Sequence, residues 1–324
     1  MKRECGIDIL RIISAIAVVF IHVVSGAVTN SVGMVDEIIA ARLELLHNLL
    51  KWSVPVFFMI TGYCLLKREE CTYKYCFGHV LKYASVLLTV GFLQAILEEI
   101  FEYRAFDCGV LVRSLQNVVS GELWDHMWYV YSVIGIYLVM PVIYCFIRKS
   151  YSDACILTAL LFLFTVVCPF AEKYITFGVT LPFGDYLFYV CFGGLIARYG
   201  VKKYSFFAFC LLGMLCAAWI VSGTGGYHFG YRSPAVCFIA IAIFMTVSKL
   251  PVKEHRFLIK FSRCTWGIYL IHPFFINIAI KVLNVDLLSS FSAIKMVGFA
   301  VIIITMSFAA TWIVRKIPYI RRLF

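Results

Sequence analysis

Runs of apolar residues, each close to the length of a membrane span, follow one another along the whole chain. A helix rises 1.5 Å per residue and the hydrocarbon core is about 30 Å thick, so a span needs about 20 apolar residues. The fifth, sixth and eighth runs are short, and each could be tilted or broken. The pattern predicts an all-α polytopic bundle of ten transmembrane helices at residues 6–28, 46–66, 80–100, 128–147, 154–170, 183–199, 204–222, 233–248, 262–283 and 295–314.

The composition supports a membrane protein. Of 324 residues, 62% are hydrophobic and 15% are charged, whereas a soluble protein of this length would expose far more charge. The apolar runs leave no room for a second soluble domain, so we expect one integral membrane domain over residues 1–324. Most of the 13 cysteines lie inside apolar runs and no C-x-x-C pair occurs, so neither a metal site nor disulfides are expected.

The basic residues predict the orientation. If the N-terminus is cytoplasmic, all but eight of the 29 lysines and arginines fall on the inner side of the ten predicted spans. This distribution follows the positive-inside rule and predicts that both termini are cytoplasmic. The net charge of +11 is scattered between spans, so it does not indicate a nucleic-acid partner. The eight outer residues are Arg42, Lys51, Arg104, Arg113, Lys173, Arg232, Lys281 and Lys295.

The first apolar run carries ionisable residues, which are costly within a membrane and therefore indicate function. Asp8 lies one turn before Arg11, and Ser25 falls on the same stripe. The eleven residues from Arg11 to His22 return to nearly the same helix face, about 16 Å along the axis. One face therefore places a cation near one membrane surface and an imidazole deep in the span.

Arg11 and His22 each have two interpretations. Arg11 could bind anionic phosphates that enter from the cytoplasm, or it could anchor the helix by reaching the headgroups or by pairing with Asp8. The imidazole of His22 is suited to act as a general base for a hydroxyl, or it could hydrogen-bond a neighbouring helix. The residues of this run alone leave these alternatives open.

Further polar residues lie on other predicted spans. His126 and Tyr129 are three positions apart at the start of the fourth span, with Trp128 between them, and they face either a cavity or the headgroups. His272 lies about ten residues inside the ninth span, beside Pro273. Two deep histidines, His22 and His272, on different helices favour a polar cavity.

Four stretches together resemble the integral membrane acyltransferase-3 family. The pattern of arginine, ten residues and histidine is met by Arg11 and His22. A Phe-Phe-x-x-Ser-Gly motif is present as Phe57 to Gly62, with Thr61 replacing serine. His126 to Tyr129, followed by Tyr137 and Pro141, is similar to the surface-polysaccharide O-acetyltransferase branch. The late stretch from Gly267 to Pro273 is also typical, although a glutamate-bearing motif of larger members near the fourth span is missing.

The resemblance implies transfer of an acyl group, usually acetyl from acetyl-CoA as donor substrate, with no metal. It implies acceptors that are hydroxyls of envelope glycans or lipid-linked sugars, and a plasma-membrane protein that could be a homo-oligomer. It also implies that His22 is the catalytic base and that Arg11 helps to hold the donor. We expect Phe57, Phe58 and Thr61 to contribute to donor binding. Candidates for the substrate pocket are Asp8, Ser25, His126, Trp128, Tyr129, Tyr269 and His272, of which Tyr129, Tyr269 or His272 could stabilise the oxyanion.

The alternative function is transport, for example of serine, because a serine-uptake branch belongs to the same family. Deep polar residues in a helical bundle serve transporters equally well. A cation at the cytoplasmic mouth, Arg11, favours the acyltransferase, since a transporter has no evident need to bind a phosphate there. A structural or sensory protein would explain the spans but not the two deep histidines.

Overall fold

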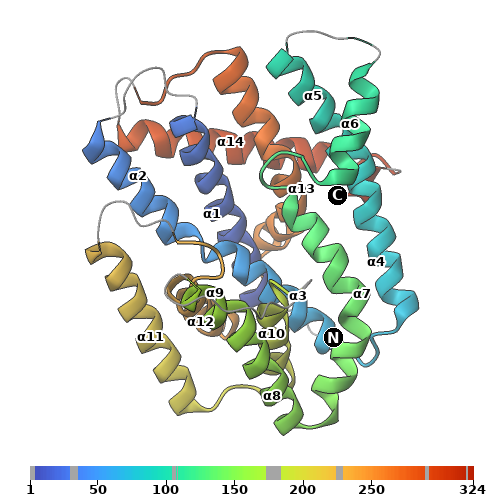
Figure 1. Ribbon diagram of the computed structural model, residues 1–324, viewed down its shortest axis with the longest axis vertical. Helices are drawn as coiled ribbons and strands as arrows, with labels where there is room; N and C mark the ends of the chain where they lie inside the picture. The colour runs from blue at the N-terminus through green and yellow to red at the C-terminus, as the bar shows by residue number, and fades with distance from the viewer. Residues whose placement is uncertain are drawn as a thin grey trace. The chain divides into compact units, whose positions relative to one another are not determined.

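The computed structural model describes residues 4–29, 36–103, 107, 109–172, 184–223, 229–288, 292–318 and 320–324, and every element in these ranges is helical (Figure 1). The described residues form two compact units. Unit 1 comprises residues 1–68 and 146–312, and unit 2 comprises residues 69–145 and 313–324. The prediction of a single domain stays a prediction, and the two units are described separately below.

Eight helical stretches in the described part of the chain are long and apolar enough to cross a membrane. They coincide with eight of the ten predicted runs. The sixth and eighth runs correspond to the shorter helices α10 and α12, so ten spans are not confirmed, and residue 183, where the sixth run was placed to begin, lies outside the described residues. The eight stretches are Cys5–Thr29, Glu37–Leu66, Tyr73–Ile100, Trp128–Lys149, Tyr151–Ala171, Lys203–Ser222, Arg256–Val282 and Ala293–Val314.

The elements of unit 1 come from both ends of the chain. They are α1 (Cys5–Thr29), α2 (Glu37–Leu50), α3 (Ser53–Leu66), α8 (Tyr151–Phe162), η2 (Leu163–Val167), α9 (Cys168–Ala171), α10 (Leu187–Tyr199), α11 (Lys203–Ser222), α12 (Pro234–Ser248), α13 (Arg256–Asn277), η3 (Ile278–Val282) and α14 (Ala293–Val314), whose last residues fall in unit 2.

The two short helices, α10 and α12, contribute many buried residues to the interior of unit 1. In α10 every residue from Phe188 to Gly194 is buried, and a helix that is apolar on all sides belongs in a core. Two glycines allow α10 to lie against α3: a Cβ on Gly62 would overlap the backbone of Val190, and one on Gly193 would overlap that of Met59. Gly62 and Gly193 therefore permit α3 and α10 to approach each other closely.

Helices α1 and α13 run in the same direction, which follows from contacts at three heights. Asp8 on α1 meets Ser262 on α13, His22 meets His272, and Gly26 lies against Ile276. A buried apolar cluster containing Val19, Val23, Cys264 and Ile268 fills part of the space between them. The polar residues of the two helices are thus held in register by apolar packing.

Unit 2 contains α4 (Tyr73–Val86), η1 (Leu87–Gly91), α5 (Phe92–Tyr103), α6 (Gly109–Ser120), most of α7 (Trp128–Lys149) and η4 (Ile320–Arg322).

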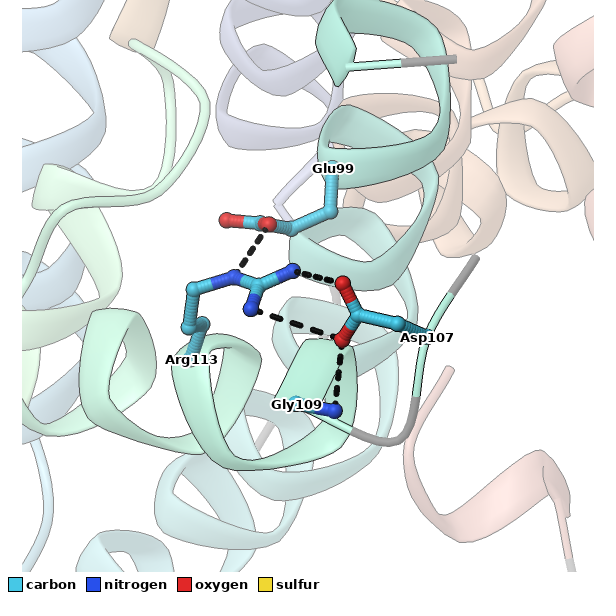
Figure 2. A network of polar contacts seen from close by, with 4 residues as sticks. All are labelled: Glu99, Asp107, Gly109 and Arg113. Atoms are coloured by element: carbon cyan, nitrogen blue, oxygen red, sulfur yellow. Dashed lines mark hydrogen bonds and ion pairs between the residues drawn. The ribbon is translucent and has the colours of Figure 1, made fainter. Parts of the chain in front are cut away.

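Helix α6 lies between the third and fourth predicted spans, where the apolar pattern predicts no membrane-spanning helix. Val110, Ser114 and Val118 form its buried stripe, four residues apart. At its start, Arg113 donates from Nε to Glu99 of α5 at 2.8 Å and contacts both oxygens of Asp107 (Figure 2). Asp107 also accepts a hydrogen bond from the amide of Gly109 at 2.6 Å. These bonds tie the first turn of α6 to α5.

Candidate functional site

The polar centre of unit 1 begins with Asp8, which is 1% exposed on α1. Its Oδ1 accepts hydrogen bonds from Arg11 Nη1 at 3.1 Å and from Ser262 Oγ at 2.6 Å. A buried carboxylate requires partners of this kind, because an unpaired charge in an apolar interior is very costly. Asp8 therefore fixes the position of the Arg11 guanidinium, and the local Asp8–Arg11 pair that the sequence allowed is present.

The other nitrogen of the Arg11 guanidinium, Nη2, lies 3.2 Å from the sulfur of Cys64 on α3. The side chain of Arg11 is 33% exposed, so part of it remains accessible despite these contacts. It opens into a cavity of about 570 Å³. This cavity is lined by Glu4, Ile7, Asp8, Arg11, Tyr63, Cys64, Lys67, Arg68, Ser262, Arg263, Thr265 and Trp266.

The charges of the Arg11 cavity are predominantly positive. Four cationic side chains line it, namely Arg11, Lys67, Arg68 and Arg263, against the carboxylates of Glu4 and Asp8. Glu4 forms an ion pair with Lys67, and Asp8 forms one with Arg11. With four cations and two carboxylates, the lining has a net positive charge, which suits an anion with several negative groups such as a polyphosphate.

The predicted donor residues of α3 lie elsewhere than the Arg11 cavity. Phe58 is fully buried and stacks on Tyr186, with ring centroids 4.6 Å apart. Thr61 donates from its hydroxyl to the carbonyl of Phe57 in its own helix at 3.0 Å. The Arg11 cavity is lined instead by the next turn of α3, which includes Tyr63 and Cys64. A role of Phe57, Phe58 and Thr61 in donor binding therefore stays a prediction.

The two deep histidines meet, with the ring centroids of His22 and His272 5.1 Å apart. His272 is fully buried and its Nδ1 lies 3.0 Å from the carbonyl oxygen of Ile268, whereas His22 is half-buried. The two histidines therefore meet in unit 1, but neither lines the Arg11 cavity, and the polar cavity expected between them stays a prediction.

A row of aromatic rings on α13 connects the Arg11 cavity with the histidine pair. Trp266 lines the cavity and stacks on Tyr269 at 5.5 Å between ring centroids. Tyr269 is in turn 6.3 Å from His272. Beyond His22, Ser25 Oγ lies 3.4 Å from Nε2 of His47 on α2. Polar and aromatic groups thus continue along α1 on both sides of His22.

The remaining predicted residues belong to unit 2. His126 is 3% exposed and its Nε2 lies 3.3 Å from Nε2 of Gln94. The rings of Trp128 and Tyr129 are in contact, with centroids 6.2 Å apart. A share of His126, Trp128 and Tyr129 in the same pocket as His22 stays a prediction.

Sequence reasoning missed several residues that the structure brings to this site. Lys67, Arg68 and Arg263 contributed only to the predicted orientation, although the basic pair Lys67–Arg68 directly after the second span could have indicated an anion site. Cys64, Ser262 and Trp266 carried no such signal, because their types are ordinary in a buried helix. His47 was missed because the predicted second span began at residue 46, which placed this histidine at the end of the span. In the structure, α2 already begins at Glu37, where the side chain of Asp36 caps it, so His47 lies well inside the helical stretch.

Residues 6–316 match the family model of the acyltransferase-3 type, described as an acyltransferase domain. No curated protein and no solved structure matches the chain. The family match spans nearly the whole chain, including His22, His272 and every residue that lines the Arg11 cavity except Glu4. This multi-pass membrane protein therefore belongs to the acyltransferase-3 family.

Proposed function

We propose that the protein is a membrane O-acyltransferase that moves an acetyl group from cytoplasmic acetyl-CoA to a hydroxyl of an extracytoplasmic glycan or lipid-linked sugar. One observation carries the proposal: a cation-rich cavity and a deep histidine pair lie on the same two parallel helices, α1 and α13. Arg11 and His22 are about 16 Å apart along α1. An extended donor can therefore place its phosphates and its reactive end at different residues.

The residues of the Arg11 cavity fit a coenzyme A donor. Guanidinium groups bind phosphates through charge-assisted hydrogen bonds, and Arg11 and Arg263 supply two of them. Trp266 offers an indole face to an aromatic base, as it already does to Tyr269. Asp8 acts as a positioning residue, since it holds the guanidinium of Arg11 and does not itself reach the chemistry.

The chemistry that we assign to His22 is general base catalysis. The imidazole accepts the proton of the acceptor hydroxyl, the oxygen attacks the thioester carbonyl, and the carbon–sulfur bond breaks. The imidazolium then returns the proton to the departing thiolate, so that an ester and free coenzyme A are formed. His272, at 5.1 Å from His22, orients the ring or stabilises its charged form. Ser25 and His47 lie on the opposite side of His22 from Arg11 and provide polar partners for an acceptor sugar.

The test is transfer of label from acetyl-CoA to membrane glycolipids by purified protein in lipid nanodiscs. Wild type, His22→Ala and His255→Ala are compared, because His255 is an exposed histidine that caps α13 outside the site. We expect labelled glycolipid from wild type and His255→Ala, and a loss of about 10²- to 10⁴-fold in His22→Ala. Succinyl-CoA in a parallel reaction tests the acyl group.

Two results would contradict the proposal. Full transfer by folded His22→Ala would show that His22 is not the catalytic base, although the protein would still be an acyltransferase. No transfer by wild type, together with saturable serine flux into vesicles, would replace the enzyme by the family-related transporter.

A further inference from the structure

A second cavity of unit 1, of about 310 Å³, lies among α8, α10, α11 and α12. It has no residue in common with the Arg11 cavity. Helix α8 packs against α10, α11 packs against α12, and residues of all four helices line the cavity. The acyl-transfer scheme makes no use of this space.

The interior of the second cavity is aromatic. The ring of Phe162 lies 5.1 Å from that of Phe188 and 5.9 Å from that of Phe238, between centroids. The ring of Phe192 lies 5.7 Å from that of Phe209. An occupant of this interior must be hydrocarbon, because a polar group would lose its hydrogen bonds there.

The mouth of the cavity carries a cation. Lys202 lines it directly before α11, and Ser205 lines it within the first turn of that helix. The N-cap side chain makes no capping hydrogen bond to α11. The first backbone N–H groups of this helix point out of its N-terminal end and have no acceptor within the helix. A lysine beside such amides is suited to a phosphate. The cavity thus has a cationic entrance and an apolar interior, which together fit an anionic amphiphile.

The depth of the cavity indicates which amphiphile. Its lining on α8 extends from Tyr151 to Phe162, eleven residues or about 16 Å. This is about half of the ~30 Å hydrocarbon core and so the thickness of one leaflet. The outer face of α11 exposes Phe207, Leu211 and Leu215, as expected of a helix that faces lipid. A membrane phospholipid matches the depth of the cavity, and it can reach the cavity from the bilayer beside α11.

We propose that the second cavity is a binding site for an anionic phospholipid. One acyl chain occupies the space between the phenylalanine rings, and the phosphate lies at the side chain of Lys202 and at the first backbone amides of α11, which a side-chain substitution at Lys203 leaves in place. The site is independent of the donor and acceptor sites of the acyltransferase reaction, and a bound lipid would hold α8 and α11 against the core helices.

The experiment is native mass spectrometry of protein taken from nanodiscs of equal parts phosphatidylglycerol and phosphatidylethanolamine, doped with undecaprenyl phosphate. We expect one phosphatidylglycerol retained preferentially by wild type. In Lys202→Ala the preference should fall about fivefold, the equivalent of about 1 kcal/mol for one lysine and an anionic lipid. Lys203→Ala removes the same charge one residue away, outside the cavity lining, and should retain the preference. Ala159→Phe should prevent retention by filling the cavity.

The outcomes separate a site from general lipid contact. Equal losses in Lys202→Ala and Lys203→Ala, or retention by Ala159→Phe as in wild type, would show ordinary surface attraction and overturn the proposal. Preferential retention of undecaprenyl phosphate would also overturn it, because the site would then take a lipid carrier. Transfer activity measured on the same samples reports separately on the proposed function.

Discussion

The imidazole rings of His22 and His272 lie 5.1 Å apart between centroids, although 250 residues separate them in the chain. His22 is half-buried and His272 is fully buried, so the two rings have different access to substrate. Within the proposed mechanism, this difference makes His22 the base and His272 a positioning residue.

Replacement of His272 by asparagine should lower kcat by about 10- to 100-fold, because misplacement of a catalytic group by about 1 Å has an effect of this size. KM for acetyl-CoA should change little, since His272 does not line the Arg11 cavity. Steady-state kinetics separate the two parameters. Unchanged kcat in a folded variant would show that the contact with His272 is not needed by His22.

Replacement of Arg11 by alanine should raise KM for acetyl-CoA about tenfold, the value of one charge-assisted hydrogen bond of about 1.5 kcal/mol. Arg11→Lys should restore part of the loss, because lysine keeps the charge but lacks the planar fork. Arg42→Ala serves as the control, since Arg42 is exposed on α2. If both alanine variants raise KM equally, general surface charge accounts for the effect.

Coenzyme A should protect Cys64 from alkylation by N-ethylmaleimide. The sulfur of Cys64 lies 3.2 Å from Arg11 Nη2 and lines the same cavity, so a bound donor would cover it. Peptide mapping by mass spectrometry gives the extent of modification at each cysteine. Cys145 is exposed on α7, and its alkylation should not depend on coenzyme A. Equal labelling of Cys64 with and without saturating coenzyme A would place the donor elsewhere.

Replacement of Gly62 by alanine should destabilise the protein by about 1–3 kcal/mol, the usual cost of overpacking. The added methyl group would collide with the backbone of Val190, which cannot rotate away as a side chain could. Gly135→Ala is the matched control, because no atom lies within 4 Å of its added Cβ. Thermal unfolding in detergent should separate the two variants, and equal midpoints would mean that α3 and α10 are less closely packed.

The start of α6 should loosen in acid. The guanidinium of Arg113, and next the amide of Gly109, hold the pKa of the Asp107 carboxyl below its ordinary value of 3.8. A lowered pKa means that the ionised group stabilises the fold above pH 3.8, and that this contribution is lost as the pH falls through the folded-state value. Amide exchange at Gly109 and Val110 should therefore lose protection only below pH 3.8.

Asp107→Asn provides the control for this acid effect. Asparagine can still accept from the Gly109 amide but cannot titrate, so the change in protection between neutral and acidic pH should disappear. If this variant shows the same acid-dependent loss as wild type, a group other than Asp107 is responsible.

The amino-acid sequence by itself determined where the apolar helices lie and which family the chain belongs to. Apolar runs are local properties, and each of the ten predicted runs overlaps a helix of the structure. The spacing of Arg11 and His22 along α1 was equally local, because an uninterrupted helix fixes it. Local periodicity also misjudged one segment, since α6 is amphipathic and too polar to stand out as a membrane span.

Only the tertiary structure decided which helices lie together. The contacts of Arg11 with Cys64, of Asp8 with Ser262 and of His22 with His272 join residues that are 53 to 254 positions apart. Such contacts depend on how whole helices pack, as in the close approach of α3 and α10 at Gly62 and Gly193. Side-chain type alone gives no such information, because a cysteine, serine or tryptophan on one buried helix carries no signal about its partner on another.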